Sequence, residues 1–165
     1  MILSNIVFSL FDKRSQQIVH ECVELMVRSE PWVTLKRSYC DVVDIINDST
    51  SEVHVARSDN QIIGFAIIKL RGAFVGYIQS VVIEPKHRGQ GIGRAFIEYL
   101  EERIFCEHPN VFICVSSFNL GAKKLYDRLG YETVGELRDY IVKGYSEILM
   151  RKSRAPLTDY IAKKK

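Results

Sequence analysis

The sequence has few cysteines, no long apolar run and no excess of one charge. Its four cysteines, Cys22, Cys40, Cys106 and Cys114, are widely spaced and form no C-x-x-C pair, which favours free thiols in a reducing compartment over a zinc site or a disulfide framework. No apolar run approaches the length of a membrane-spanning helix. The N-terminus begins apolar and becomes charged only at Asp12, the reverse of a signal peptide. We therefore expect a cytoplasmic protein with no membrane partner.

Charge and composition exclude further classes of protein. The 23 Lys and Arg residues stand against 20 Asp and Glu, a net charge of +3, and basic residues do not alternate with aromatic ones, so we expect no nucleic-acid partner. We find no internal repeat and no low-complexity segment. A 165-residue chain with 47% apolar residues can bury one core. We predict a single domain over residues 1–152 and a polar, basic, frayed C-terminal tail over residues 153–165.

The spacing of apolar residues predicts alternating strands and helices. Apolar residues recur with the helical spacing in four segments, residues 16–29, 35–47, 92–104 and 120–129. Thr34 is the expected N-cap of the second helix, although its capping box is incomplete. Short apolar or alternating runs predict strands at residues 2–11, 52–57, 61–70, 74–83, 110–115, 131–137 and 145–150. The three strands within residues 52–83 are expected to be consecutive and antiparallel.

A basic, glycine-rich loop joins one of these strands to the helix that follows. It reads Arg88-Gly89-Gln90-Gly91-Ile92-Gly93. Because the first N–H groups of a helix have no partner within it and its dipole is positive there, such a loop can bind a phosphate through the main chain. The loop lacks the Lys-Ser or Lys-Thr of a Walker motif, and Phe96 stands where a dinucleotide-binding loop has its third glycine. Taken alone, the hexapeptide fits an ordinary glycine-rich turn equally well.

A second motif lies one helix and one strand further along the chain. Residues 119–131 read N-x-x-A-x-x-L-Y-x-x-x-G-Y. This motif and the earlier R-x-x-G-x-G, in this order and on these elements, resemble the GCN5-related N-acetyltransferase (GNAT) superfamily. The likeness covers residues 52–150, and residues 140–152 are most similar to the ribosomal-protein N-terminal acetyltransferase group. The resemblance implies an α/β (α+β) fold with a mixed, mostly antiparallel sheet of about seven strands flanked by four helices.

The resemblance also implies an activity. A GNAT protein uses acetyl-CoA as co-substrate, without a metal, and transfers the acetyl group to a primary amine, here a protein N-terminus, a lysine or a small molecule. We expect direct attack in a ternary complex, since no activated Cys-His pair is evident for an acyl-enzyme. The partners are then acetyl-CoA and the amine acceptor, and a homodimer is left open. The alternative is a non-catalytic acyl-CoA-binding regulatory or interaction module.

The family motifs assign roles to particular residues. Main-chain groups of Val81, Val82 and Ile83 would face the pantetheine arm and the thioester carbonyl. The amides of residues 88–93 would hold the pyrophosphate, with added charge from Arg88 and Arg94. The residues concerned in this loop are Arg88, Gly89, Gln90, Gly91, Ile92, Gly93 and Arg94.

Two residues of the second motif have both a functional and a structural explanation. Asn119 would bind the CoA arm, and it is also a natural N-cap of the helix that follows. Tyr126 matches the family's general acid, whose phenol can give a proton to the leaving sulfur and whose ring would contact the cofactor. The helical spacing alone predicts that Tyr126 is a core aromatic residue on the buried face of its helix. Only the match to the family motif favours the role of general acid for Tyr126.

The general base does not follow from the resemblance. Cys114 occupies the position at which the ribosomal-protein group has a glutamate, and a thiol of ordinary pKa near 8.5 is a poor substitute. The base is then another carboxylate, His54 or a chain of waters. Glu84 is close in sequence but has a structural explanation, and Glu147 is a further candidate.

Overall fold

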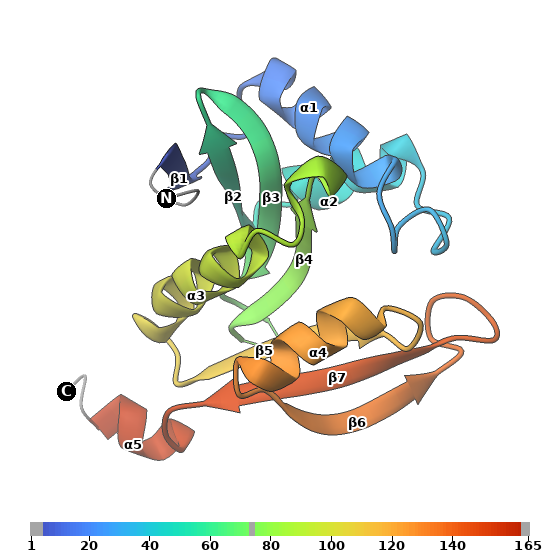
Figure 1. Cartoon of the computed structure of the whole chain (residues 1–165). Helices are drawn as coiled ribbons and strands as arrows, with labels where there is room; N and C mark the ends of the chain where they lie inside the picture. Colours follow the sequence, from blue (N-terminus) through green and yellow to red (C-terminus); the bar gives the residue numbers. More distant parts are fainter. Residues whose placement is uncertain (1–4, 73–74, 163–165) are drawn as a thin grey trace. The chain divides into compact units, whose positions relative to one another are not determined.

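The computed structural model describes residues 5–72 and 75–162 (Figure 1). The first half of the chain forms β1 (Ile6–Leu10), α1 (Gln16–Val27), α2 (Tyr39–Asn47), β2 (Ser51–Ser58), β3 (Gln61–Lys69) and β4 (Tyr77–Ile83). The second half forms a short 3-10 helix η2 (Pro85–His87), α3 (Ile92–Phe105), β5 (Asn110–Ser116), α4 (Leu120–Arg128), β6 (Glu132–Arg138), β7 (Ser146–Ser153) and α5 (Leu157–Ala162). Each strand and each of the four helices predicted from the sequence is present.

The strands follow the order β1-β2-β3-β4-β5-β7-β6 in one sheet. β1 runs antiparallel to β2, and β7 runs antiparallel to both β5 and β6, whereas β4 and β5 are parallel. Asp59 and Asn60 both have positive φ and connect β2 to β3 in two residues, which is the geometry of a tight antiparallel hairpin. The predicted mixed, mostly antiparallel sheet of seven strands is confirmed.

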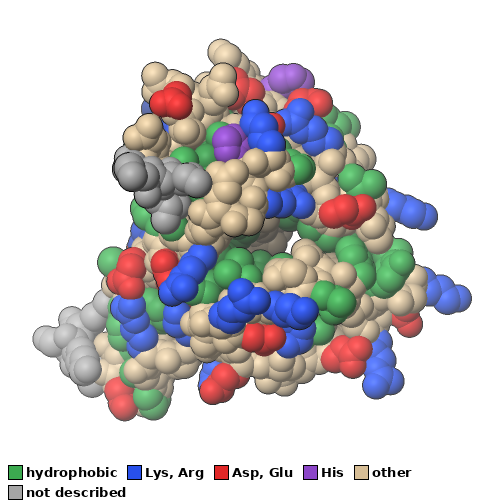
Figure 2. Space-filling view, viewed as in Figure 1, with side chains coloured by type: hydrophobic (Ala, Val, Ile, Leu, Met, Phe, Trp, Pro, Cys, Tyr) green, Lys and Arg blue, Asp and Glu red, His purple; other side chains and the backbone are tan. Residues whose placement is uncertain are grey.

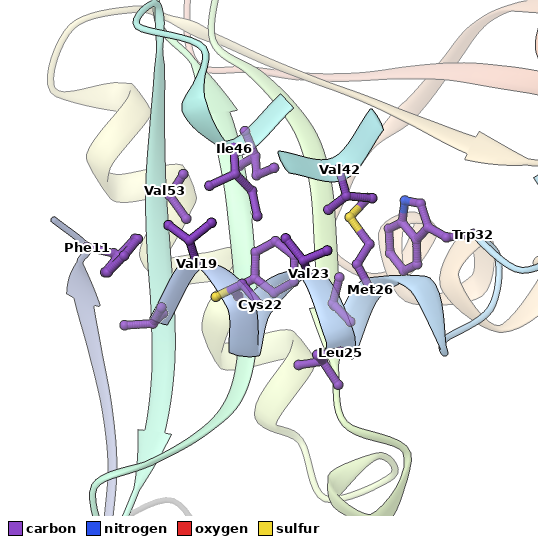
Figure 3. Close-up of a cluster of buried hydrophobic side chains, with 14 residues drawn as sticks. Phe11, Val19, Cys22, Val23, Leu25, Met26, Trp32, Val42, Ile46 and Val53 are labelled. Carbon is purple, nitrogen blue, oxygen red and sulfur yellow. The ribbon is translucent and has the colours of Figure 1, made fainter. Parts of the chain in front are cut away.

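Two compact units make up the chain. The first comprises the residues up to Ile68 together with Ser80–Tyr99, and the second comprises Lys69–Gln79 and the residues from Leu100 onwards. In the first unit, α1 and α2 bury one face each against β2, β3 and β4 (Figure 3). The core side chains of α1 are spaced as a helix requires: Val19, Cys22, Val23 and Met26. The second unit has a core of its own, built on alternate residues of β5 and on β7: Val111, Ile113, Val115 and Met150.

The second helix begins later than the sequence analysis predicted. Its N-cap is Ser38 and not Thr34, because the Ser38 hydroxyl accepts from the Asp41 N–H while the Asp41 carboxylate accepts from the Ser38 N–H. This complete capping box outcompetes the incomplete one at Thr34. Lys36 has a φ of 54°, which no helix contains, and so the segment before Ser38 is a turn.

The prediction of a frayed tail is wrong for the described part of the tail. β7 continues to Ser153, and a fifth α-helix, α5, follows at Leu157–Ala162. The Tyr160 hydroxyl donates to the Phe105 carbonyl oxygen at 2.5 Å, and Arg154 lies over the Phe105 ring. Residues 163–165 lie outside the described residues, as do residues 2–4 and 74 of the predicted strands. The tail is thus held by contacts with residues far away in the sequence, and the composition of the tail itself cannot predict such contacts.

The surface carries charged side chains of both signs, and the described residues contain neither a membrane-spanning helix nor a metal-binding cluster. Lys and Arg side chains are interspersed with Asp and Glu over the face shown in Figure 2. Within the described ranges, no helix has both the length and the apolar character needed to cross a membrane. The same residues contain no group of three or more His, Cys, Asp or Glu side chains arranged to hold a metal ion.

Candidate functional site

Two glycines of the loop have a left-handed backbone conformation. Gly89 and Gly91 have φ values of +74° and +82°, in the left-handed region where residues with a Cβ are strained. A Cβ at either position would meet no heavy atom within 4 Å. These two glycines therefore serve backbone conformation and leave the space beside the main chain open.

The loop leads directly into the first turn of α3. The Ala95 N–H donates to the Gly91 carbonyl oxygen at 3.1 Å, which makes this the opening hydrogen bond of the helix. The N–H groups of Ile92, Gly93 and Arg94 precede that bond, so they belong to the set that a helix leaves without internal partners. Arg94 is exposed and pairs with Glu98 one turn on, at 2.9 Å. The start of α3 thus gathers main-chain donors, the positive end of a 14-residue helix and an arginine.

The basic side chains before the glycines are held by the protein itself. The Glu84 carboxylate lies 3.2 Å from Lys86 Nζ, 3.8 Å from His87 Nε2 and 3.5 Å from an Arg28 nitrogen. Arg88 Nε donates to the Ile83 carbonyl oxygen at 2.8 Å, which folds the start of the loop back onto the end of β4. Glu84 is accordingly a structural anchor for the basic side chains around the loop.

The end of β4 is fixed by close packing on β3. Val82 and Ile83 are buried and Val81 is half-buried. A Cβ on Gly64 of β3 would lie 2.6 Å from both the Val82 carbonyl oxygen and Ile83 Cδ1, so only glycine fits there. The Glu84 N–H donates to the Ile63 carbonyl oxygen at 2.8 Å. The strand that leads into the loop therefore has a fixed end point.

Asn119 and Tyr126, the two predicted residues of the second unit, lie on α4. Asn119 is its N-cap, with Oδ1 accepting from the Ala122 N–H at 3.2 Å, so its structural explanation is confirmed. Tyr126 lies seven residues later, on the same face, with 8% of its surface exposed and its ring 5.8 Å from that of Tyr131. Burial raises the pKa of the Tyr126 phenol, which therefore stays protonated at neutral pH.

A cluster that the sequence analysis did not assemble lies on one face of β4, β5 and β7 in the second unit. The Ser116 hydroxyl donates to Glu147 Oε1 at 2.5 Å, between residues that are directly opposite in the β5–β7 ladder. Tyr77, which pairs with Phe112, is hydrogen-bonded to Cys114. Phe112, Cys114 and Ser116 alternate along β5, so they point to one face. The sequence analysis had named Cys114 and Glu147 separately, and the period-2 spacing of Cys114 and Ser116 was a further signal that they share a face.

The charge state of Cys114 follows from these neighbours. Burial raises the pKa of the Cys114 thiol, and the charge of Glu147 adds to this, while the hydrogen bond with Tyr77 acts in the opposite direction. The net pKa is above the ordinary value, so Cys114 is a neutral thiol at pH 7. Its sulfur is therefore a poor acceptor for a proton from an amine.

His54, another candidate base, lies in the first unit with partners on both ring nitrogens. Nδ1 is 3.1 Å from the Tyr99 hydroxyl and Nε2 is 3.1 Å from Glu52 Oε2, and only 1% of the residue is exposed. The Tyr99 ring lies edge-on to the imidazole. Because both nitrogens are engaged inside the core, His54 is a structural histidine.

The predicted site residues thus fall into two groups. Val81–Arg94 form one continuous segment of the first unit, and Asn119 and Tyr126 share one helix face in the second. Among the described residues, the β4–β5 ladder pairs Tyr77 with Phe112 and Ile78 with Ile113, and the β5–β7 ladder pairs each residue of Asn110–Ser116 with a residue of β7.

Comparison with known proteins identifies the family. A family model described as "Acetyltransferase (GNAT) family" matches residues 19–131. The chain is 30% identical over 105 residues to an uncharacterised N-acetyltransferase of Methanocaldococcus jannaschii, covering 61% of this chain and 65% of that protein. It is 31% identical over 101 residues to the N-alpha-acetyltransferase RimI of Mycobacterium tuberculosis, covering 59% and 63%. The matches thus span slightly less than two thirds of either relative.

A solved structure shows the same fold. An aminoglycoside 6'-N-acetyltransferase complexed with coenzyme A aligns with a TM-score of 0.73 and 17% identity, covering 91% of this chain and 98% of that one. An identity this low supports the fold and not the substrate. Since the family model matches well over half of the sequence and both motifs lie on the elements expected for them, the chain belongs to the GNAT acetyltransferase family.

Proposed function

We propose that this protein binds acetyl-CoA through residues 88–94 and transfers its acetyl group to a primary amine by direct attack in a ternary complex. The observation that carries the proposal is the loop at the start of α3, where two left-handed glycines leave the main chain open beside the positive end of a long helix. A pyrophosphate fits such a site because main-chain N–H groups supply both hydrogen bonds and charge.

The side chains around the loop support an anionic ligand. Arg94 pairs with Glu98 only at the surface, where an ion pair contributes little, so Arg94 can turn to a phosphate at small cost. Glu84, which would repel a phosphate, is surrounded by Arg28, Lys86 and His87. The coenzyme A bound to the aminoglycoside enzyme of the same fold is consistent with this assignment.

The chemistry assigns Tyr126 as the acid. Attack by the amine on the thioester carbonyl carbon breaks the bond to sulfur, and the departing thiolate needs a proton. Because burial keeps the Tyr126 phenol protonated, it can supply that proton at any physiological pH. The main chain of Val81, Val82 and Ile83, held in place by Gly64, would face the thioester carbonyl as negative charge develops on its oxygen.

One observation favours the alternative, a module that binds acyl-CoA without turnover. Cys114 is a neutral thiol and cannot serve as a base, so a base has to come from elsewhere for catalysis to proceed. The printed names of the relatives do not agree on one acceptor, since one is an N-alpha-acetyltransferase and the structural neighbour acetylates an aminoglycoside. We therefore propose a primary amine as the acceptor without choosing between protein and small molecule.

The test is calorimetric titration of acetyl-CoA, with ATP and NAD as controls, followed by a thiol-release assay with pooled peptides and small amines. Selective binding with amine-dependent release of free coenzyme A is the expected result. Selective binding without release from any pool would favour the regulatory module. No binding of acetyl-CoA would contradict the assignment of the glycine loop.

A further inference from the structure

We propose that the side chain of Gln79 positions the acceptor amine by accepting a hydrogen bond from its nitrogen, an assignment that rests on the proposed acetyl transfer. Gln79 is the third residue of β4 and is half-buried. Its Oε1 is covered by the protein, yet it has no hydrogen-bond partner among the residues that the structure describes. Such an atom is rare in a folded protein, because giving up water without a replacement lowers stability.

The polar side chains beside Gln79 differ from it because each of them has a partner. Continuing the parallel register of β4 and β5 brings Gln79 level with Cys114. The Cys114 thiol is hydrogen-bonded to Tyr77, which lies two residues before Gln79 on β4. Further along β5, the Ser116 hydroxyl donates to Glu147 Oε1. These groups are engaged with one another, and none of these bonds involves the Gln79 amide.

The face of the sheet that carries Gln79 is only partly covered. Side chains alternate along a strand, so Gln79 shares its face of β4 with Tyr77. Both are half-buried, as are Cys114 and the residue opposite it on β7, Leu149. The other face of β5 and β7 is fully buried, at Val111, Ile113, Val115 and Met150. Because the last torsion of a glutamine side chain is broad, a rotation of the amide turns Oε1 toward the partly open face.

The chemistry of an amide oxygen selects the kind of ligand. This oxygen accepts hydrogen bonds and donates none, so its partner has to carry an N–H or O–H group. A primary amine reaches the site as an ammonium ion with three N–H donors, and it keeps two of them after it loses a proton. The hydrogen bond therefore persists while the lone pair of the nitrogen becomes available for attack. An amide does not take the proton, so Gln79 orients the nitrogen without acting as the base.

The acceptor fits this oxygen better than the reacting groups of acetyl-CoA do. The pyrophosphate and the thioester carbonyl accept hydrogen bonds, and the proposed site gives them main-chain N–H groups. The oxygen of an amide has no donor to offer either of them. The acceptor amine is the reactant whose reacting atom carries donors. Gln79 is thus assigned to the acceptor, and its loss should leave the affinity for acetyl-CoA unchanged.

The first measurement compares the melting temperatures of Gln79→Met, Gln61→Met and the wild-type protein. Methionine has nearly the length and volume of glutamine but no amide. Because Gln79→Met removes a buried oxygen that has no partner, its melting temperature should rise by about 2–12 °C. Gln61, the first residue of β3, is exposed, so water reaches its amide. Gln61→Met is therefore the matched control and should melt near the wild-type temperature.

The second set of measurements tests recognition of the amine. With ethylamine as acceptor, Gln79→Met should lose about 10- to 150-fold in kcat/KM, as expected for a hydrogen bond to a charged group. Calorimetry should find its affinity for acetyl-CoA unchanged. Ethylammonium chloride should raise the melting temperature of the wild-type protein more than tetramethylammonium chloride does, because the second cation has the same charge but no N–H donor. In Gln79→Met the two salts should act alike.

A gain in stability together with a loss of kcat/KM supports the assignment, because a purely structural role would lower both. A wild-type kcat/KM in Gln79→Met, a lower melting temperature or weaker binding of acetyl-CoA would each overturn it. Equal effects of the two salts on the wild-type protein would overturn it as well. All four results leave acetyl transfer by the wild-type protein intact. Absence of thiol release from the wild-type protein with every amine would overturn acetyl transfer itself, and the assignment of Gln79 with it.

Discussion

Replacing Gly76 by alanine should destabilise the protein far more than the same change at Gly72. Both glycines have positive φ, +81° and +106°, and both lie in the connection between β3 and β4. At Gly72 an added Cβ would meet nothing within 4 Å. At Gly76 it would lie 2.3 Å from the Asn110 carbonyl oxygen and 2.8 Å from Ile104 Cγ2. The pair therefore separates backbone strain from steric overlap.

The magnitude follows from these contacts. An unfavourable φ costs about 1–3 kcal/mol at either glycine. At Gly76 the overlap is with backbone, which has to move by about 1 Å, and overpacking of this kind adds about 1–3 kcal/mol. The movement also threatens the hydrogen bond from the Phe112 N–H to the Gly76 carbonyl oxygen, and an unsatisfied buried donor costs about 1–3 kcal/mol. We expect a total of about 3–9 kcal/mol, against about 1–3 kcal/mol at Gly72.

Urea unfolding followed by circular dichroism measures both free energies of unfolding. A loss near the upper figure approaches the whole stability of a domain, so Gly76→Ala should show a much lower midpoint or no cooperative transition. Gly72→Ala should unfold cooperatively with an unchanged slope. If the two variants differ by less than about 1 kcal/mol, the close approach of Gly76 to β5 does not exist, and the pairing of Tyr77 with Phe112 is in doubt.

Three further predictions concern the site. Tyr126→Phe should lower turnover roughly 10²- to 10⁴-fold while calorimetry finds acetyl-CoA affinity unchanged, and unaltered turnover would remove Tyr126 as the acid. Gly91→Glu should abolish acetyl-CoA binding by placing bulk and negative charge at the pyrophosphate, and a variant that still binds would contradict the loop assignment. Burial raises the pKa of the Tyr77, Tyr126 and Tyr131 phenols in the folded protein above the value of about 10 that they have in the unfolded chain. Above pH 10 the unfolded chain therefore loses these protons while the folded protein keeps them, which favours unfolding. Their contribution to stability is complete below about pH 10 and is lost as the pH rises. The free energy of unfolding should therefore fall above pH 10 by about 1.4 kcal/mol per pH unit for each tyrosine, and a flat profile there would contradict their burial.

Much of the fold and part of the site could be predicted from residue order because their causes are local. The helical spacing of Val19, Cys22, Val23 and Met26 predicts which face of α1 is buried, and this prediction does not depend on where the helix lies in the fold. Asn119 predicts an N-cap because its side chain bonds the main chain three residues on. The same local reasoning gave the wrong start for α2. Ser38 and Thr34 are both possible N-caps, and the helix begins after Ser38 because only Ser38 forms a complete capping box.

Other features depend on contacts between residues far apart in the chain. α5 was not foreseen because Tyr160 and Arg154 bind residues of α3 more than 50 positions earlier. His54 and Glu147 both remained candidate bases by sequence, since each is a titratable residue on a predicted strand. Burial with two partners makes His54 structural, whereas strand register brings Glu147 to Ser116 beside Cys114. The sequence by itself determined the elements and the family motifs, because propensity and capping act over a few residues. Only the tertiary structure decided which carboxylate faces Cys114, because a register between strands 31 residues apart is a property of the folded sheet.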